Sequence, residues 1–82
     1  MVSGRVQGVA FRASCLRMAE QHEVSGWVRN LPDGSVEAVF EGDPGQVRQL
    51  VEWARHGPRF ALVEDVLVKQ EPPEGIGGFE IR

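Results

Sequence analysis

The turn sequence LPDG, at residues 31–34, constrains the fold of this 82-residue chain more than any other stretch. Pro32 fixes φ at a value that suits a tight turn, and Gly34 can adopt the positive φ that a hairpin requires. The segments on either side, 24–30 (VSGWVRN) and 35–42 (SVEAVFEG), alternate apolar with polar residues, as half-buried strands do. The sequence therefore predicts a β-hairpin around this turn.

A helix-forming segment lies on each side of the predicted hairpin. Residues 12–23 contain neither glycine nor proline, and apolar residues recur there at a spacing of three or four. The second helix is expected to begin at Asp43, which forms a capping pair with Gln46, and to end before Gly57–Pro58. Its apolar stripe consists of Val47, Leu50, Val51 and Ala54.

Further strands complete the pattern, at the start of the chain, at residues 61–70 (ALVEDVLVKQ) and at residues 79–82 (FEIR). The order strand, helix, strand, strand, helix, strand is that of an α+β ferredoxin-like (βαββαβ) sandwich, whose antiparallel sheet carries two helices on one face. A chain of this length supports one core. We therefore expect residues 1–82 to form a single domain with a short extra C-terminal strand.

Basic residues are concentrated near the N-terminus. Residues 1–19 contain Arg5, Arg12 and Arg17 and no acidic residue, whereas the net charge of the whole chain is −3. A local positive field on an acidic protein suits a small anion better than a nucleic acid. Because there is one cysteine, Cys15, and no apolar run of membrane-spanning length, we expect a soluble cytoplasmic protein.

The sequence offers few residues for metal binding or covalent catalysis. His22 and His56 are not at metal-ligand spacing from Cys15 or from a carboxylate cluster, so we expect no metal and no other cofactor. Cys15 lies on the apolar side of the first predicted helix, which favours packing over nucleophilic catalysis. The Gly-x-Ser-x-Gly elbow and the lysine of nucleotide-binding loops are also missing.

The stretch GRVQGVAFR, at residues 4–12, has two interpretations. Successive N–H groups of a glycine-containing turn can converge on an anion, the following helix adds partial positive charge, and Arg12 can grip two phosphate oxygens. The alternative is a glycine bulge beside a solvated arginine. The role of Asn30 is also undecided at this point, because an asparagine immediately before LPDG is an ordinary turn residue.

Two segments resemble the signature segments of the acylphosphatase family: SGRVQGVAFR, at residues 3–12, and GWVRNLPDGSV, at residues 26–36. Their order and spacing are typical of that family, and the resemblance extends through nearly the whole chain. It implies the ferredoxin-like fold and an enzyme that hydrolyses the carboxyl-phosphate bond of acyl phosphates without a metal. The implied partner is a small acyl phosphate, and phosphate or sulfate is expected to fit the same site.

The roles of the family's site residues carry over by position. Arg12 matches the phosphate-binding arginine, and Asn30 matches the asparagine that orients the attacking water. The side chain of Gln7 is not required for the chemistry, although its N–H belongs to the phosphate loop. The backbone of that loop comprises Arg5, Val6, Gln7, Gly8, Val9, Ala10 and Phe11. Relatives usually have several more residues before the first motif, so the first strand is short or the true start lies upstream.

Two other functions are weighed against this one. The first is a non-catalytic or accessory acylphosphatase-like module that binds phosphate or carbamoyl phosphate, as in hydrogenase-maturation proteins. The second is a ligand-sensing or RNA-binding ferredoxin-like module, and an RNA-binding sheet needs exposed aromatic residues and a basic surface. A chain with no tyrosine and a net charge of −3 offers neither of these. We therefore expect a monomeric acylphosphatase that binds no nucleic acid.

Overall fold

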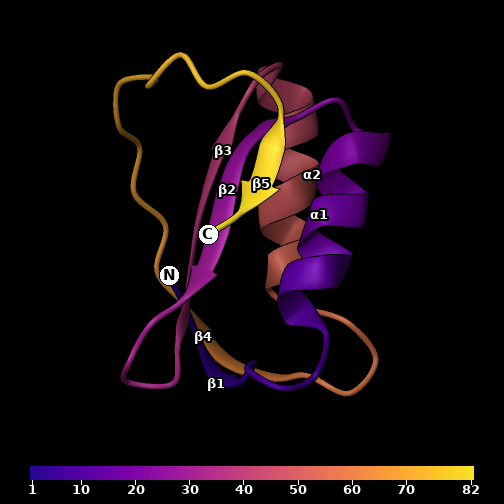
Figure 1. Ribbon diagram of the computed structural model, residues 1–82, viewed down its shortest axis with the longest axis vertical. Coiled ribbons are helices and arrows are strands. Elements are labelled where there is room, and N and C mark those ends of the chain that lie inside the picture. The colour runs from indigo at the N-terminus through magenta and orange to yellow at the C-terminus, as the bar shows by residue number, and fades with distance from the viewer.

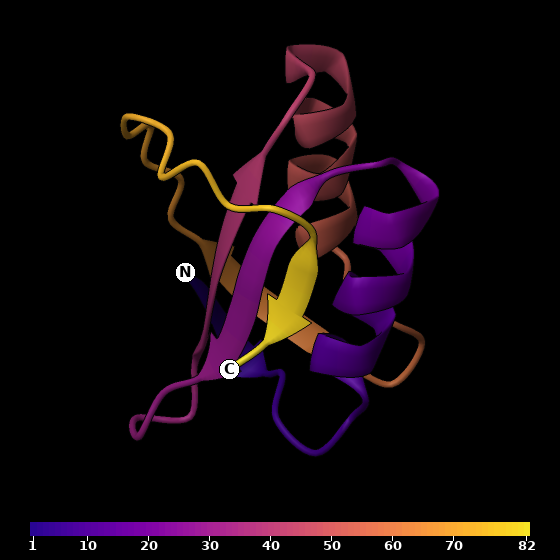
Figure 2. The same cartoon turned by 45° about the horizontal axis from the view of Figure 1, so that its top comes forward.

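The computed structural model describes residues 1–82. Along the chain, its elements are β1 (Val2–Arg5), α1 (Phe11–Gln21), β2 (Ser25–Asn30), β3 (Val36–Glu41), α2 (Pro44–Ala54), β4 (Leu62–Val66) and β5 (Phe79–Ile81). The strands form one five-stranded sheet in the order β4-β1-β3-β2-β5. Both helices lie on the same face of this sheet (Figure 1, Figure 2). This arrangement is the predicted α+β ferredoxin-like sandwich.

The four strands of the βαββαβ core pair antiparallel, as predicted. β2 and β3 form the hairpin, with Asn30 opposite Val36, and β1 lies between β3 and β4. The short C-terminal strand β5 pairs parallel with β2, so the complete sheet is mixed. Apolar alternation within a strand does not reveal the direction of its neighbour, and the sequence therefore did not specify this pairing.

β4 is shorter than the strand predicted at residues 61–70. It ends at Val66, which pairs with Val2 of β1. The pairing finishes where Met1 and Leu67 exchange main-chain hydrogen bonds of 2.9 and 3.0 Å. Leu67 and Val68 consequently lie in the loop that leads to β5, with exposed side chains.

α2 begins where its capping residues predict. Asp43 accepts a hydrogen bond from the N–H of Gln46 at 3.2 Å, and Pro44 is the first residue of the helix. The apolar faces of both helices close over the sheet and form two clusters of buried residues. The larger cluster comprises Val2, Val6, Phe11, Cys15, Val28, Val36 and Ala54, and the smaller comprises Ala19, Val24 and Leu50.

Cys15 is part of this core, as the sequence predicted. Its side chain is fully buried and forms no disulfide. Burial raises the pKa of the thiol to about 12, because an apolar environment disfavours the thiolate. The thiol is therefore protonated at neutral pH, and Cys15 serves packing and not nucleophilic catalysis.

Glu41, the last residue of β3, fastens the loop that leads to β5. Its carboxylate accepts hydrogen bonds from the main-chain N–H groups of Glu74, Gly75 and Ile76, at 2.5, 3.1 and 3.2 Å. The bond from Glu74 is the main reason why the pKa of Glu41 is lowered, since these N–H groups favour the ionised carboxylate. The charge of Glu41 thus helps to hold the segment before β5 against the sheet.

Replacing Glu41 by glutamine is expected to lower the melting temperature at pH 7 by a few degrees, because a neutral amide accepts weaker hydrogen bonds. The pKa of Glu41 is lower in the folded than in the unfolded state. Its stabilising contribution is therefore complete well above the pKa of an unperturbed glutamate, about 4.3, and is lost as the pH falls through the lower pKa that Glu41 has in the folded protein.

Thermal unfolding followed by circular dichroism between pH 7 and pH 3 checks this expectation. Acid should lower the melting temperature less in Glu41→Gln than in the unchanged protein. Glu71→Gln is the control, since Glu71 is an exposed glutamate of the same loop. Identical pH profiles for Glu41→Gln and the unchanged protein would show that Glu41 does not act through its charge.

Candidate active site

The loop between β1 and α1 is anchored by apolar side chains. Val6 and Phe11 are buried in the core, and Val9 packs against it. Gly8 and Ala10, which alternate with them, are exposed. The apolar residues of the GRVQGVAFR segment therefore fix the path of the loop, and its backbone stays at the surface.

Two residues of this loop have a left-handed backbone. The φ angles of Gly8 and Ala10 are 74° and 62°, and Val9 between them lies outside the positive-φ region. Where left-handed residues alternate with right-handed ones, successive N–H groups can converge on an anion. A Cβ atom at Gly8 would meet nothing within 4 Å, so this position needs glycine for its φ angle and not for lack of space.

The N–H groups of the loop and of the first turn of α1 are free to bind a ligand. None of the main-chain N–H groups of residues 7–13 donates a hydrogen bond to another protein group, and Ser14 is the first that does. α1 has no side-chain cap at its N-terminus and no acidic residue in its first turn. Free N–H groups at the start of a helix carry partial positive charge and attract anions.

Arg12, the second residue of α1, adds a full positive charge at this position. Its side chain is partly buried and forms neither an ion pair nor a hydrogen bond with the protein. Arg5, at the exposed end of β1, also has no acidic partner. The arginines that form ion pairs are elsewhere, in the pairs Arg29–Glu37, Arg55–Glu52 and Arg82–Glu80. The guanidinium of Arg12 therefore has no carboxylate that competes with an anionic ligand.

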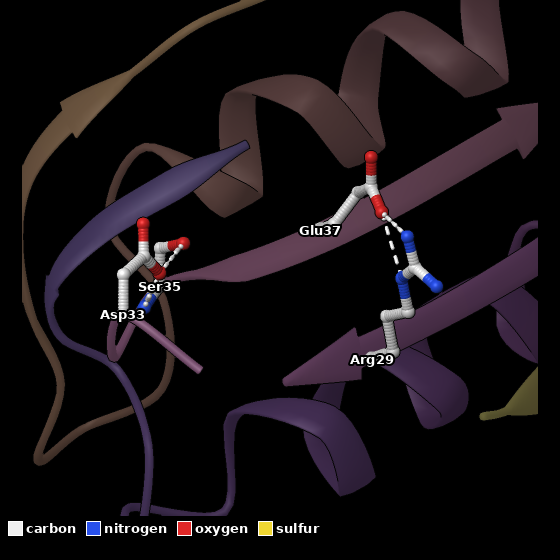
Figure 3. A network of polar contacts seen from close by, with 4 residues as sticks. All are labelled: Arg29, Asp33, Ser35 and Glu37. Atoms are coloured by element: carbon white, nitrogen blue, oxygen red, sulfur yellow. Dashed lines mark hydrogen bonds and ion pairs between the residues drawn. The ribbon is translucent and has the colours of Figure 1, made fainter. Parts of the chain in front are cut away.

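The turn between β2 and β3 lies at the same end of the molecule as this loop (Figure 1, Figure 2). The Asp33 carboxylate accepts hydrogen bonds from the N–H of Ser35 at 2.9 Å and from its hydroxyl at 2.5 Å (Figure 3). The hydroxyl bond is the main reason why the pKa of Asp33 is lowered. Arg29 and Glu37 form an ion pair of 2.6 Å across the two strands. These contacts hold the turn in one shape.

Asn30 is the last residue of β2, immediately before this turn. Its side-chain Oδ1 is buried and accepts no hydrogen bond from the protein. A buried amide oxygen without a partner is costly unless a water molecule or a ligand donates to it. Asn30 thus presents an acceptor that an ordinary turn residue would not need.

The side chain of Gln7 joins the loop to the turn. Its Nε2 donates hydrogen bonds to the main-chain oxygens of Leu31 at 2.8 Å and Ser35 at 2.9 Å. The two signature segments therefore meet, with the residue after Asn30 held against the loop that precedes Arg12. Sequence reasoning missed this contact, because hydrogen bonds between residues 24 and 28 positions apart leave no periodic signal.

Two further observations concern metal-ligating side chains and membrane-spanning helices. No group of three or more His, Cys, Asp or Glu side chains gathers in a way that could hold a metal ion. His22 instead contacts Oε1 of Gln46 through Nδ1 at 2.6 Å. Neither α1 nor α2 is long and apolar enough to cross a membrane.

The chain is similar to acylphosphatases over nearly its whole length. The family model for acylphosphatase matches residues 1–81. A curated acylphosphatase of Rubrobacter xylanophilus is 61% identical over 82 residues, which cover 99% of this chain and 74% of that protein. One from Thermococcus kodakarensis is 58% identical over 80 residues, covering 98% of this chain and 88% of that protein. The solved structure of an acylphosphatase from Coxiella burnetii matches with a TM-score of 0.95 at 41% identity, covering 99% of this chain and 85% of that chain.

The chain belongs to the acylphosphatase family. The prediction of an enzyme that hydrolyses the carboxyl-phosphate bond of acyl phosphates is thereby confirmed. Its substrates are small molecules that carry an acyl phosphate group.

Proposed function

We propose that the loop of residues 5–11 and Arg12 bind the phosphate group of the substrate, and that Asn30 orients the attacking water. The N–H groups of the loop donate to the phosphate oxygens, and the guanidinium binds two of these oxygens as a fork. The observation that carries this proposal is the run of unpaired N–H groups at residues 7–13, next to an arginine without an acidic partner.

The chemistry needs little more than these groups. Water attacks the phosphorus in line with the bond to the acyl oxygen, and that phosphorus–oxygen bond breaks as the new one forms. The leaving carboxylate is a stable anion, so no general acid has to protonate it. A phosphate oxygen of the substrate takes the proton of the water. The products are a carboxylate and inorganic phosphate, and no histidine or carboxylate base is needed.

Positioning and charge stabilisation supply the rate enhancement. The N–H groups and Arg12 stabilise the negative charge of the transferring phosphoryl group, and they are in place before the reaction begins. Oδ1 of Asn30 accepts a hydrogen bond from the water and so directs its lone pair towards the phosphorus. The buried, unpartnered Oδ1 of Asn30 supports this role.

We further propose that residues 1–82 act as one domain and as a monomer in the cytoplasm. The five strands form a single sheet, which supports a single domain. Cys15 is a buried free thiol, which suits a reducing compartment. The net charge of −3 disfavours nucleic acid as a partner. Inorganic phosphate and sulfate are expected to occupy the loop, and no metal or cofactor is required.

Hydrolysis of benzoyl phosphate with and without a chelator tests this proposal. We expect phosphate release at the same rate in both conditions, with competitive inhibition by inorganic phosphate. A rate that collapses in the chelator would contradict the metal-independent mechanism. Binding of phosphate without any turnover would support the accessory-module alternative.

A further inference from the structure

We infer that the side chain of Gln7 is a positioning residue for this reaction, because it sets the placement of Asn30 relative to the phosphate loop. This inference rests on the proposed function. It assigns a task to a side chain that the sequence analysis gave no part in the chemistry.

The carboxamide of Gln7 uses both of its hydrogens on the turn. Nε2 lies 2.8 Å from the main-chain oxygen of Leu31 and 2.9 Å from that of Ser35. Among neutral side chains, only a primary amide offers two donors on one atom. The same two oxygens close the turn, since Ser35 O accepts from the N–H of Leu31 at 2.9 Å and Leu31 O accepts from the N–H of Gly34 at 3.1 Å. Gln7 is therefore built into the closure of the turn.

The two hydrogen bonds of Gln7 are the ones that join loop residues 6–10 to turn residues 31–35. Each of the two segments is otherwise held from its own side. The loop is anchored by Val6 and Phe11 in the core, and the turn by Asp33. Removing the amide of Gln7 should consequently leave both segments folded and release only their mutual alignment.

Alignment matters here because Leu31 directly follows Asn30. A shift of the Leu31 carbonyl moves the Asn30 carboxamide relative to the phosphate that the loop holds. In-line attack requires the water at roughly 3–3.5 Å from the phosphorus, and a misplacement of about 1 Å can cost on the order of 10²-fold in rate. The N–H groups of the loop and Arg12 do not depend on this alignment to bind phosphate.

The test is Gln7→Met, which keeps the length of the side chain but has no N–H. We expect kcat for benzoyl phosphate to fall by roughly 10- to 100-fold. The inhibition constant of inorganic phosphate should change by less than about 3-fold, because the loop N–H groups and Arg12 still bind phosphate. Gln7→Asn, which keeps the amide but is one methylene shorter, should give the same split. An unchanged kcat in both variants would overturn the inference.

Asp43→Ala is the matched control for a loss of stability. It removes the cap of α2 at the opposite end of the molecule (Figure 1), so the melting temperature should fall while kcat stays unchanged. If Asp43→Ala and Gln7→Met lose activity equally at equal stability, the effect of Gln7 is structural and the inference is wrong.

A double-mutant cycle shows whether Gln7 acts through Asn30. Adding Gln7→Met to Asn30→Ala should cost little further activity, whereas losses that multiply would overturn the inference. Full turnover by Asn30→Ala alone would instead remove the proposed function, and this inference with it. If Arg12→Ala and Asn30→Ala lose activity as expected but Gln7→Met keeps its full kcat, the inference about Gln7 is wrong while the proposed function stands.

Discussion

Replacing Arg12 by alanine is expected to lower kcat for benzoyl phosphate by on the order of 10²–10³ or more, the range found when one preorganised donor to a developing charge is lost. The guanidinium is the one full positive charge in the first turn of α1, and the protein gives it no carboxylate partner. Its removal leaves only main-chain N–H groups to hold the phosphate. Steady-state kinetics should show weaker competitive inhibition by phosphate as well as slower turnover.

Arg12→Lys should also be strongly impaired, although it keeps the charge. An ammonium group is a point-like donor and cannot bind two phosphate oxygens as a planar fork does. Arg48→Ala serves as the control, because Arg48 is an exposed arginine on α2 and lies outside the loop. Near-normal turnover of benzoyl phosphate by Arg12→Lys would show that the fork geometry is unimportant.

Replacing Asn30 by alanine is expected to abolish most turnover, by about 10²-fold or more, while inorganic phosphate still binds competitively. The Oδ1 atom is buried and unpartnered in the protein, so its loss removes a contact to water and no internal hydrogen bond. Steady-state kinetics with phosphate as inhibitor separate the two effects, and thermal unfolding checks that β2 and β3 stay paired. If phosphate binding is lost together with turnover, Asn30 is a structural residue of the turn.

The elements that could be predicted from the sequence are those that depend on local chemistry. The hairpin follows from LPDG, and α2 follows from Asp43, Pro44 and the apolar stripe that includes Leu50. Each of these signals acts within about four residues, which is the range of capping bonds and turns. The burial of Cys15 was also expected, because its position on α1 follows from helical periodicity.

The features that could not be predicted depend on partners distant in the sequence. The end of β4 at Val66, opposite Val2 of β1, and the parallel pairing of β5 with β2 depend on neighbouring strands. The contacts of Glu41 with residues 74–76 join segments more than 30 positions apart. None of these pairings leaves a periodic pattern in the chain.

Some features of the candidate site could likewise be predicted from the sequence, and others could not. The excess of arginine near the N-terminus and the glycines of the loop indicate an anion, but the roles of Arg12 and Asn30 came from the family resemblance. The left-handed backbone of Ala10 was not expected, because a residue other than glycine rarely adopts it. The buried oxygen of Asn30 and the two hydrogen bonds of Gln7 depend on how the loop and the turn lie together in the folded chain.

A crystal structure of the protein grown with inorganic phosphate tests the binding loop most directly. We expect the anion to lie about 2.7–3.2 Å from several N–H groups of residues 7–13, with two of its oxygens bound by Arg12. A structure in which these N–H groups point apart, Arg12 extends into solvent and the phosphate binds elsewhere would contradict the account.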